Sequence, residues 1–156
     1  MLIGIQDVKS TLVYFYVQKT SPFTAKSSQV PFEVVVLNTG AAYDSNSGQF
    51  IAPTSGIYYF SFSGSPVNSI VSVSLRLNNE EVATTTTTVS TVTPITLSAT
   101  LSLNASDTVA LWLESGGLAG MHNKHVTYFS GFLLQEYLPI NENYGPFNET
   151  NFKNLK

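Results

Sequence analysis

The feature that most constrains the fold of this chain is a two-residue period of apolar side chains that recurs along most of its length. Within residues 57–63, the rings of Tyr58, Phe60 and Phe62 occupy every second position. Successive side chains of a β-strand point to opposite faces of a sheet, so these rings share one face. The same alternation recurs at residues 70–77, 95–103 and 107–115. No long window carries a helical stripe, so the chain is predicted to be all-β.

Other segments complete the pattern of strands. A threonine-rich segment at residues 82–92 suits a half-solvated strand, and a last strand is expected at about residues 126–134. Residues 12–17 are apolar on both faces and form a further plausible strand. Strands separated by about ten to twelve residues, with polar turns between them, predict a two-sheet sandwich or a jelly roll.

The chain is long enough for one domain with a short extension at each end. We predict an N-terminal extension at residues 1–20, a globular domain at 21–137 and a C-terminal extension at 138–156. The last segment is rich in Asn, Pro and Gly and has no period, which is typical of an extended tail. The sequence leaves open whether residues 1–20 add a strand to the sandwich.

The charge of the chain is low and slightly acidic. Charged residues make up 11% of the chain and the net charge is −3, with no basic run. This balance gives no reason to expect nucleic acid or an anionic membrane as a partner. No apolar stretch is long enough to insert into a membrane. The sparse charge predicts that Ser and Thr cover the surface, or that part of it is buried against other subunits.

Several classes of function find no support in the motifs. The chain has no cysteine, which excludes disulfides and thiolate chemistry. It also lacks a nucleophile elbow, a phosphate-binding loop and a His-Glu-x-x-His metal motif, so we expect no enzymatic activity. The first residues do not read as a signal peptide. Two glycosylation sequons begin at Asn104 and Asn148 and favour a secreted, extracellular protein.

A spaced set of residues between Phe32 and Phe62 carries a family resemblance. Its members are Phe32, Asn38, Tyr43, Phe50, Gly56, Tyr58, Phe60 and Phe62. This set resembles the signature of the C1q domain at every fixed position. The resemblance extends over about residues 21–137, where Phe23-Thr24-Ala25 is similar to the first strand of the family and residues 128–134 to its last. The same residues suit a core, so we interpret the signature as structural and not as the binding site.

The resemblance implies a fold and an assembly. C1q domains resemble the tumour-necrosis-factor family, which implies a ten-stranded jelly-roll sandwich that assembles as a homotrimer. On the strand of Tyr58 and on the last strand, large apolar groups lie on both sides, and the second side needs its own partner. We therefore predict a trimer interface formed by the outward residues of these strands, namely Ile57, Tyr59, Tyr128, Phe132 and Leu134.

The absence of collagen triplets makes the chain similar to stand-alone C1q heads, which implies lectin-like recognition of carbohydrate or microbial surface ligands in innate immunity. The glycine-rich loop at residues 116–125 is the first candidate for the site, with His122, Asn123, Lys124 and His125. These side chains suit a sugar hydroxyl or a metal, and equally a plain exposed loop. Trp112 suits stacking on a sugar ring or filling a subunit contact.

The sequence does not decide whether the chain binds calcium or which biological role it has. Asp44, Asp107 and Glu114 are candidate calcium ligands, as the resemblance suggests, although their spacing is not that of a known calcium loop. No other cofactor is expected. Besides multivalent recognition, the fold suits an extracellular structural or self-assembling protein, or a ligand for a receptor, and the fold alone does not choose among these roles.

Overall fold

The alternation in the sequence becomes alternating burial in the computed structural model, which describes residues 12–67, 70–87 and 93–137. In β6 (Gly56–Gly64) every second residue is buried, and the residues between them are half-buried. A strand with two such different faces packs one face into a core and leaves the other at a surface. The described residues contain no helix, and hence none that would be long and apolar enough to cross a membrane.

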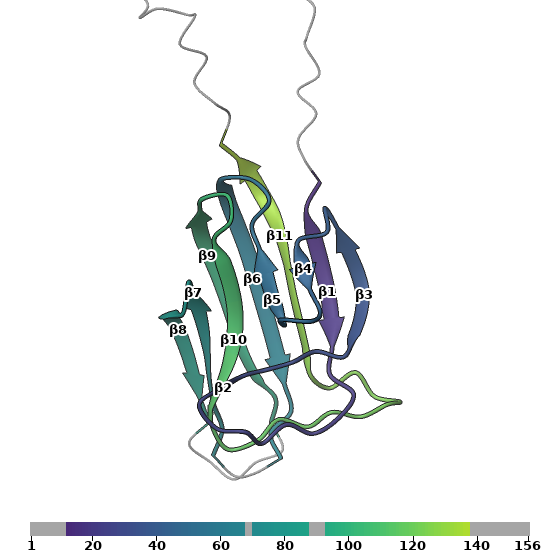
Figure 1. The fold of residues 1–156 in the computed structure, drawn as a ribbon. Coiled ribbons are helices and arrows are strands. Elements are labelled where there is room, and N and C mark those ends of the chain that lie inside the picture. The colour runs from purple at the N-terminus through teal and green to yellow at the C-terminus, as the bar shows by residue number, and fades with distance from the viewer. Residues whose placement is uncertain (1–11, 68–69, 88–92, 138–156) are drawn as a thin grey trace, which may run out of the picture.

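The described residues form eleven strands in two antiparallel sheets (Figure 1), which confirms the prediction of an all-β sandwich. The five-stranded sheet has the order β3-β1-β11-β6-β9, and we call it the β6 sheet. The six-stranded sheet, called the β10 sheet, has the order β4-β5-β10-β7-β8, with β2 paired to β10. The other bounds are β1 (Tyr14–Gln18), β2 (Ser28–Gln29), β3 (Val34–Thr39), β4 (Tyr43–Asp44), β5 (Gln49–Ile51), β7 (Ser72–Leu77), β8 (Glu80–Thr86), β9 (Ile95–Leu103), β10 (Thr108–Ser115) and β11 (Tyr128–Glu136).

Strands that are far apart in the sequence lie side by side. The first described strand, β1, pairs with β11, the last. The last strand also pairs with β6, so β11 lies between two strands that precede it by much of the chain. Figure 1 shows the start of β1 and the end of β11 at the same end of the sandwich, with the long loops gathered at the opposite end. This crossing order is that of a jelly roll.

The core between the sheets is built mainly from aromatic rings. Phe15 is 2% exposed and stacks on Tyr43 and Phe50, with ring centroids 5.3 and 5.4 Å away. Phe129 meets Phe15 edge-on at 5.0 Å. Rings at these separations contribute dispersion and quadrupole interactions beyond the burial of their area. Each buried ring stabilises the fold by about 1.5–3 kcal/mol through burial alone.

The residues of the signature lie in or beside this core. Its aromatic members are at most 3% exposed: Phe32, Tyr43, Phe50, Tyr58, Phe60 and Phe62. The Asn38 side chain holds the turn before β4, because its amide donates to the Tyr43 carbonyl at 2.8 Å and its carbonyl accepts the Tyr43 N–H at 3.0 Å. At Gly56 a Cβ atom would lie 2.9 Å from the Leu133 side chain and still closer to the Gln135 carbonyl, so the pairing of β6 with β11 leaves no space for a side chain.

One expectation about the strands needs correction, and one question that the sequence left open is answered. The segment Phe23-Thr24-Ala25 is not the first strand, because Phe23 forms only an isolated bridge to Leu118 and its neighbours lie in a loop. The first strand is β1, which includes most of the apolar segment at residues 12–17 and lies inside the β6 sheet. The described part of the predicted N-terminal extension therefore contributes a strand to the sandwich. The predicted C-terminal extension, residues 138–156, lies outside the described residues.

Candidate functional site

The outward face of the β6 sheet carries a row of aromatic side chains, which we call the aromatic face. Its members come from β1, β6 and β11: Tyr14, Tyr16, Tyr59, Tyr128 and Phe132. The register places Phe132 opposite both Tyr14 and Tyr59, so the row runs across three adjacent strands. The ring centroids of Tyr59 and Phe132 are 5.4 Å apart, and those of Tyr16 and Tyr128 are 5.6 Å apart.

The predicted interface residues belong to this face. Ile57 and Tyr59 are half-buried on β6, and Tyr128 is half-buried on β11. Phe132 and Leu134 are 42% and 63% exposed, which is high for large apolar side chains. Hydroxyl side chains border the row on the same face: Ser61, Ser63, Thr96, Ser98, Thr100 and Ser130. The interface predicted from the sequence did not include Tyr14 and Tyr16, although their alternation with Phe15, which is buried, was a usable signal.

The second candidate surface is the end of the sandwich where long loops meet, which we call the loop end. It consists of the described loops at residues 19–27, 65–67 and 116–127. Backbone hydrogen bonds join them, because Phe23 and Leu118 exchange N–H and carbonyl groups at 2.8 Å and Val67 N–H donates to the Gly117 carbonyl at 2.8 Å. The three loops therefore form one continuous surface opposite the start of β1 (Figure 1).

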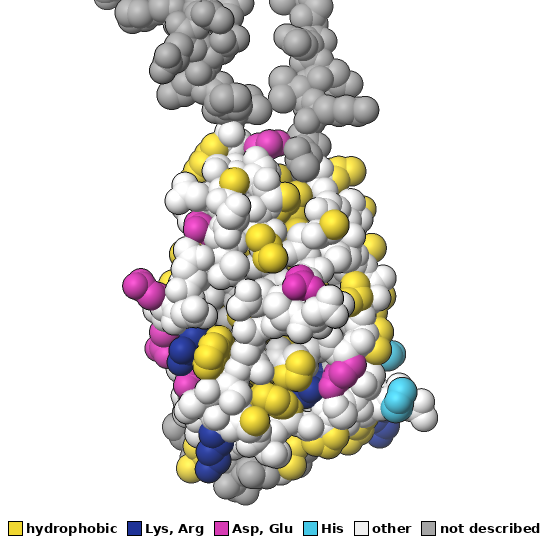
Figure 2. Space-filling model, in the orientation of Figure 1, with side chains coloured by type: hydrophobic (Ala, Val, Ile, Leu, Met, Phe, Trp, Pro, Cys, Tyr) yellow, Lys and Arg dark blue, Asp and Glu magenta, His cyan; other side chains and the backbone are white. Residues whose placement is uncertain are grey.

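The predicted ligand-binding residues of the glycine-rich loop lie at the tip of this surface. His122, Asn123, Lys124 and His125 are all exposed. The tip is closed by a bridge between Met121 and Lys124. In Figure 2 the histidine side chains stand out at the edge of the molecule. These side chains are displayed to solvent and are available to a ligand.

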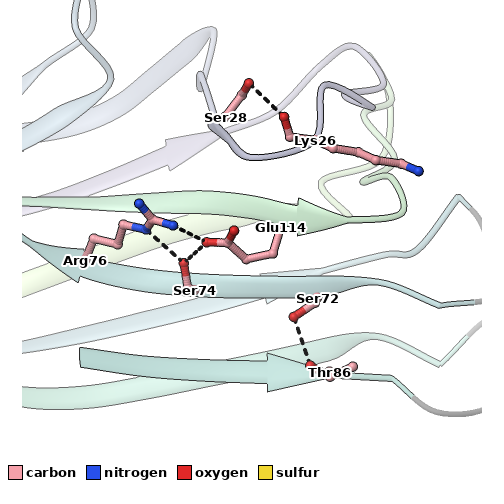
Figure 3. Close-up of polar contacts among 7 residues, drawn as sticks. All are labelled: Lys26, Ser28, Ser72, Ser74, Arg76, Thr86 and Glu114. Atoms are coloured by element: carbon pink, nitrogen blue, oxygen red, sulfur yellow. Dashed lines mark hydrogen bonds and ion pairs between the residues drawn. The ribbon is translucent and has the colours of Figure 1, made fainter. Parts of the chain in front are cut away.

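The structure does not bring Trp112 to this tip. Trp112 lies on the outward face of β10, and the guanidinium carbon of Arg76 lies 4.2 Å from the centre of its ring. Figure 3 shows that Arg76 also meets Glu114 and Ser74, from β10 and β7. An indole ring that already contacts a guanidinium group is less available for stacking on a sugar. Trp112 and the glycine-rich loop are thus two separate places.

Glu114 is held as an ionised partner of this cluster. Its Oε1 atom accepts a hydrogen bond from Ser74 Oγ at 2.5 Å and one from Arg76 Nη2 at 2.8 Å. The hydrogen bond from Ser74 is the largest cause that lowers the pKa of Glu114; partial burial opposes it, and Arg76 adds to the lowering. Glu114 therefore forms part of a local ion pair.

The three candidate calcium ligands do not converge. Asp44 lies at the end of β4, where its Oδ1 accepts the Asn46 N–H at 2.9 Å. Asp107 accepts hydrogen bonds from Asn78 Nδ2 at 2.8 Å and from Asn104 N–H at 2.7 Å. Glu114 pairs with Arg76. Within residues 12–67, 70–87 and 93–137 no three His, Asp or Glu side chains are grouped so that they could hold a metal ion.

One buried charge was not predicted from the sequence. Lys19, which follows β1, is 1% exposed, and its Nζ atom donates to Glu33 Oε1 at 2.8 Å and to the Pro31 carbonyl at 3.0 Å. The same carboxylate accepts hydrogen bonds from Thr20 N–H and Ser21 Oγ. The ring of Phe23 lies 5.1 Å from the amino group. This ion pair fixes the base of the loop end.

The described sequon lies far from the loop end. Asn104 is exposed in the turn between β9 and β10, and its backbone N–H is bonded to Asp107. Because β10 runs from this turn to Gly116, the two features lie at opposite ends of the strand. The second sequon, at Asn148, lies outside the described residues.

Comparison with known proteins gives a consistent result. A sequence model of the C1q domain family matches residues 14–134. The chain is 33% identical over 128 residues to mouse "Complement C1q tumor necrosis factor-related protein 3", and 33% identical over 141 residues to the human protein of that name. Each match covers 80% of this chain and 52% of the relative, so the chain spans about half the length of the curated relatives it matches.

Solved structures share the fold at low sequence identity. The globular domain of zebrafish complement 1qA protein superposes with a TM-score of 0.66 at 19% identity, covering 80% of this chain and 99% of that one. Eiger TNF from S. frugiperda gives 0.61 at 13% identity, with coverages of 84% and 98%. Murine APRIL gives 0.61 at 12% identity, with coverages of 79% and 99%. This chain thus shares the jelly-roll fold of these proteins.

Proposed function

This chain belongs to the C1q domain family, and from that premise we propose that it is an extracellular, non-enzymatic protein that recognises carbohydrate or other microbial surface ligands as a homotrimer. The observation that supports this proposal most directly is the aromatic face. The core side of the β6 sheet is already packed, so the rings on its outward side need a partner from outside the protomer.

The composition of the aromatic face favours a subunit contact. Aromatic residues are enriched at interfaces between subunits, and a stable interface buries about 800 Å² on each partner. The row of rings from Tyr14 to Tyr59 supplies the apolar centre of such a patch, and the hydroxyl side chains around it supply a polar border. No side chain of the row carries a charge that would have to be desolvated.

Sedimentation of charge variants tests the assembly. We expect the wild-type protein to sediment as a trimer at micromolar concentration, and Phe132→Lys or Tyr59→Lys to dissociate it, because each places three lysines at the contact. Thr84→Lys, at an exposed position of β8, adds the same charge on the other sheet and should leave the trimer intact. A wild-type protein that is monomeric at this concentration would contradict the proposal.

The ligand site of the proposal is the tip of the loop end. A trimer would present three copies of His122, Asn123, Lys124 and His125 in the same direction, which raises a weak affinity for each sugar through avidity. A glycan array, read with and without calcium, should show binding by the wild-type trimer. An Asn123→Ala/His125→Ala variant should lose it, and the dissociated Phe132→Lys variant should bind much more weakly.

A structural, self-assembling role is the second candidate, and the edge strand β3 favours it. Four consecutive apolar residues of β3, Val34 to Leu37, are 38–53% exposed, and the strand pairs only with β1 among the described strands. Exposed apolar edges are prone to pair with other chains. Concentration-dependent assembly beyond the trimer, together with an array on which nothing binds, would favour this role. Only the shared fold supports a role as a ligand for a receptor.

A further inference from the structure

Charges are segregated along the sandwich in a way that the net charge of −3 conceals. The described cations are Lys19, Lys26, Arg76 and Lys124. Lys19 and Arg76 are held in ion pairs with Glu33 and Glu114. The two that remain, Lys26 and Lys124, are exposed, and both belong to the loop end.

The carboxylates show the opposite distribution. Glu33, at the base of the loop end, is neutralised by Lys19, and Glu114, near the end of β10, is neutralised by Arg76. The other described carboxylates lie away from this end: Asp44 at the end of β4, Glu80 and Glu81 in β8, Asp107 before β10 and Glu136 at the end of β11. The segments at residues 68–69 and 88–92 contain no charged residue. The loop end is therefore cationic on an acidic protein.

From this distribution we infer that the loop end binds an acidic polysaccharide, a chain of sugars that carries carboxylate or sulfate groups. The inference rests on the proposed carbohydrate recognition and names the class of carbohydrate. Lys26 and Lys124 supply charge, and the exposed side chains of His122, Asn123 and His125 next to Lys124 supply polar groups for sugar hydroxyls.

The placement of the cations favours a polymer over a small anion. Lys26 follows β1 in one loop, and Lys124 lies at the tip of another. Figure 2 shows basic side chains at both lower corners of the molecule, so the exposed cations of this end do not meet at one point. A chain with repeated negative groups would reach both, whereas a single phosphate or carboxylate would not. Exposed cations of this kind attract a polyanion over a Debye length of about 8–10 Å at moderate salt.

Immobilised dextran sulfate and uncharged dextran are suitable probes, because they share a backbone and differ in charge. We expect the wild-type protein to bind dextran sulfate, to bind dextran much more weakly, and to lose affinity as salt is raised. Lys26→Gln/Lys124→Gln removes both cations without adding bulk, and should lower the apparent affinity by about tenfold or more, because a trimer loses them at three sites at once.

A matched control separates the loop end from the net charge. Val82→Glu/Thr84→Glu lowers the net charge by the same amount at exposed positions of β8, and should retain most of the binding. Equal losses in the two variants would overturn the inference, as would equal binding of dextran and dextran sulfate. Binding to phosphatidylglycerol-containing vesicles without binding to dextran sulfate would assign the cations to a lipid surface and would also overturn it.

The outcomes for this inference and for the proposed function can be told apart. If the trimer binds neutral sugars on the array but not dextran sulfate, only the acidic class is wrong. If the protein is a monomer and still binds dextran sulfate through Lys26 and Lys124, the inference stands and the trimeric assembly is wrong.

Discussion

Lys19 shows how a single residue is stabilised where its type is rarely found. A buried amino group loses its hydration, and this loss is compensated only when the group is paired and hydrogen-bonded. Glu33 and the Pro31 carbonyl supply these partners, and the ring of Phe23 adds a cation–π contact. The pair joins the end of β1 to the segment before β3, so it closes the base of the loop end.

The ionisation of Glu33 predicts a pH dependence. Burial on its own would raise the pKa of Glu33, but hydrogen bonds from Lys19, Ser21 and Thr20 outweigh it and lower the pKa from 4.5 to about 2. A lowered pKa in the folded state stabilises the fold above the unfolded value, and this contribution is lost as the pH falls toward the folded value. Wild type should thus exceed Glu33→Gln in free energy of unfolding above pH 4.5, and the gap should close toward pH 2. Urea unfolding of both proteins across this range measures it; a constant gap would contradict the assignment.

The cluster on β10 gives a spectroscopic prediction. The chain has one tryptophan, so emission excited at a wavelength that tyrosine does not absorb reports on Trp112 alone. Arg76→Met removes the guanidinium that lies 4.2 Å from the ring centre, and should change the emission maximum and cost about 1 kcal/mol of stability. Arg76→Lys keeps the charge without the planar group and should fall between the two. An emission spectrum that is unchanged in Arg76→Met would show that the contact does not persist in solution.

At the scale of elements, the paired strands β6 and β11 separate two kinds of aromatic residue. Inward rings such as Phe60 pack in the core, and outward rings such as Phe132 form the aromatic face. Gly131 makes this arrangement possible, because a Cβ atom there would lie 2.7 Å from the rings of both Phe15 and Phe60. The two faces of one ribbon thus serve the protomer and, by our proposal, the trimer.

Substitution on the two faces should have different consequences. Phe60→Ala removes a buried ring and should destabilise the protomer by about 3–5 kcal/mol. Phe132→Ala removes a ring that is 42% exposed and should change protomer stability by less than about 1 kcal/mol, while it weakens trimer association. Denaturant unfolding at low concentration and sedimentation at high concentration measure the two effects. Equal destabilisation of the protomer by both changes would show that Phe132 serves the fold.

At the scale of the whole molecule, the two ends of the sandwich differ in character. One end holds the start of β1, the end of β11 and the turn with Asn104 (Figure 1). The other end holds the joined loops with Lys26 and Lys124. A ligand at the loop end and a glycan at Asn104 would therefore not compete for the same space.

This separation predicts that a glycan at Asn104 affects neither trimer assembly nor ligand binding. In protein secreted from eukaryotic cells, Asn104→Gln should remove the mass of one glycan while leaving the trimeric state and dextran sulfate binding unchanged. Mass spectrometry of the intact protein checks the first expectation. A change in trimer formation on removal of the glycan would show that this turn lies closer to a subunit contact than we propose.

Much of the fold was predictable because its signal is local. Alternation places Tyr58, Phe60 and Phe62 on one face whatever the rest of the chain does, and their burial follows from their apolar surface. The same argument identified Tyr59 and Phe132 as outward residues. Asn38 and Gly56 belong to the same spaced set, and the structure supplies their reasons: Asn38 holds a turn, and Gly56 lies where β11 leaves no space for a side chain.

The remaining features required the three-dimensional structure, because they depend on partners that are distant in sequence. Arg76 and Glu114 form an ion pair because β7 and β10 are neighbours, and the same Arg76 makes the Trp112 ring less available for stacking on a sugar. The charge asymmetry likewise needs the positions of every ion pair, because neutralising Glu33 and Glu114 is what leaves Lys26 and Lys124 as the net charge of the loop end. A two-residue period fixes the face of each side chain, but the free energy that selects neighbouring strands comes from the whole core at once.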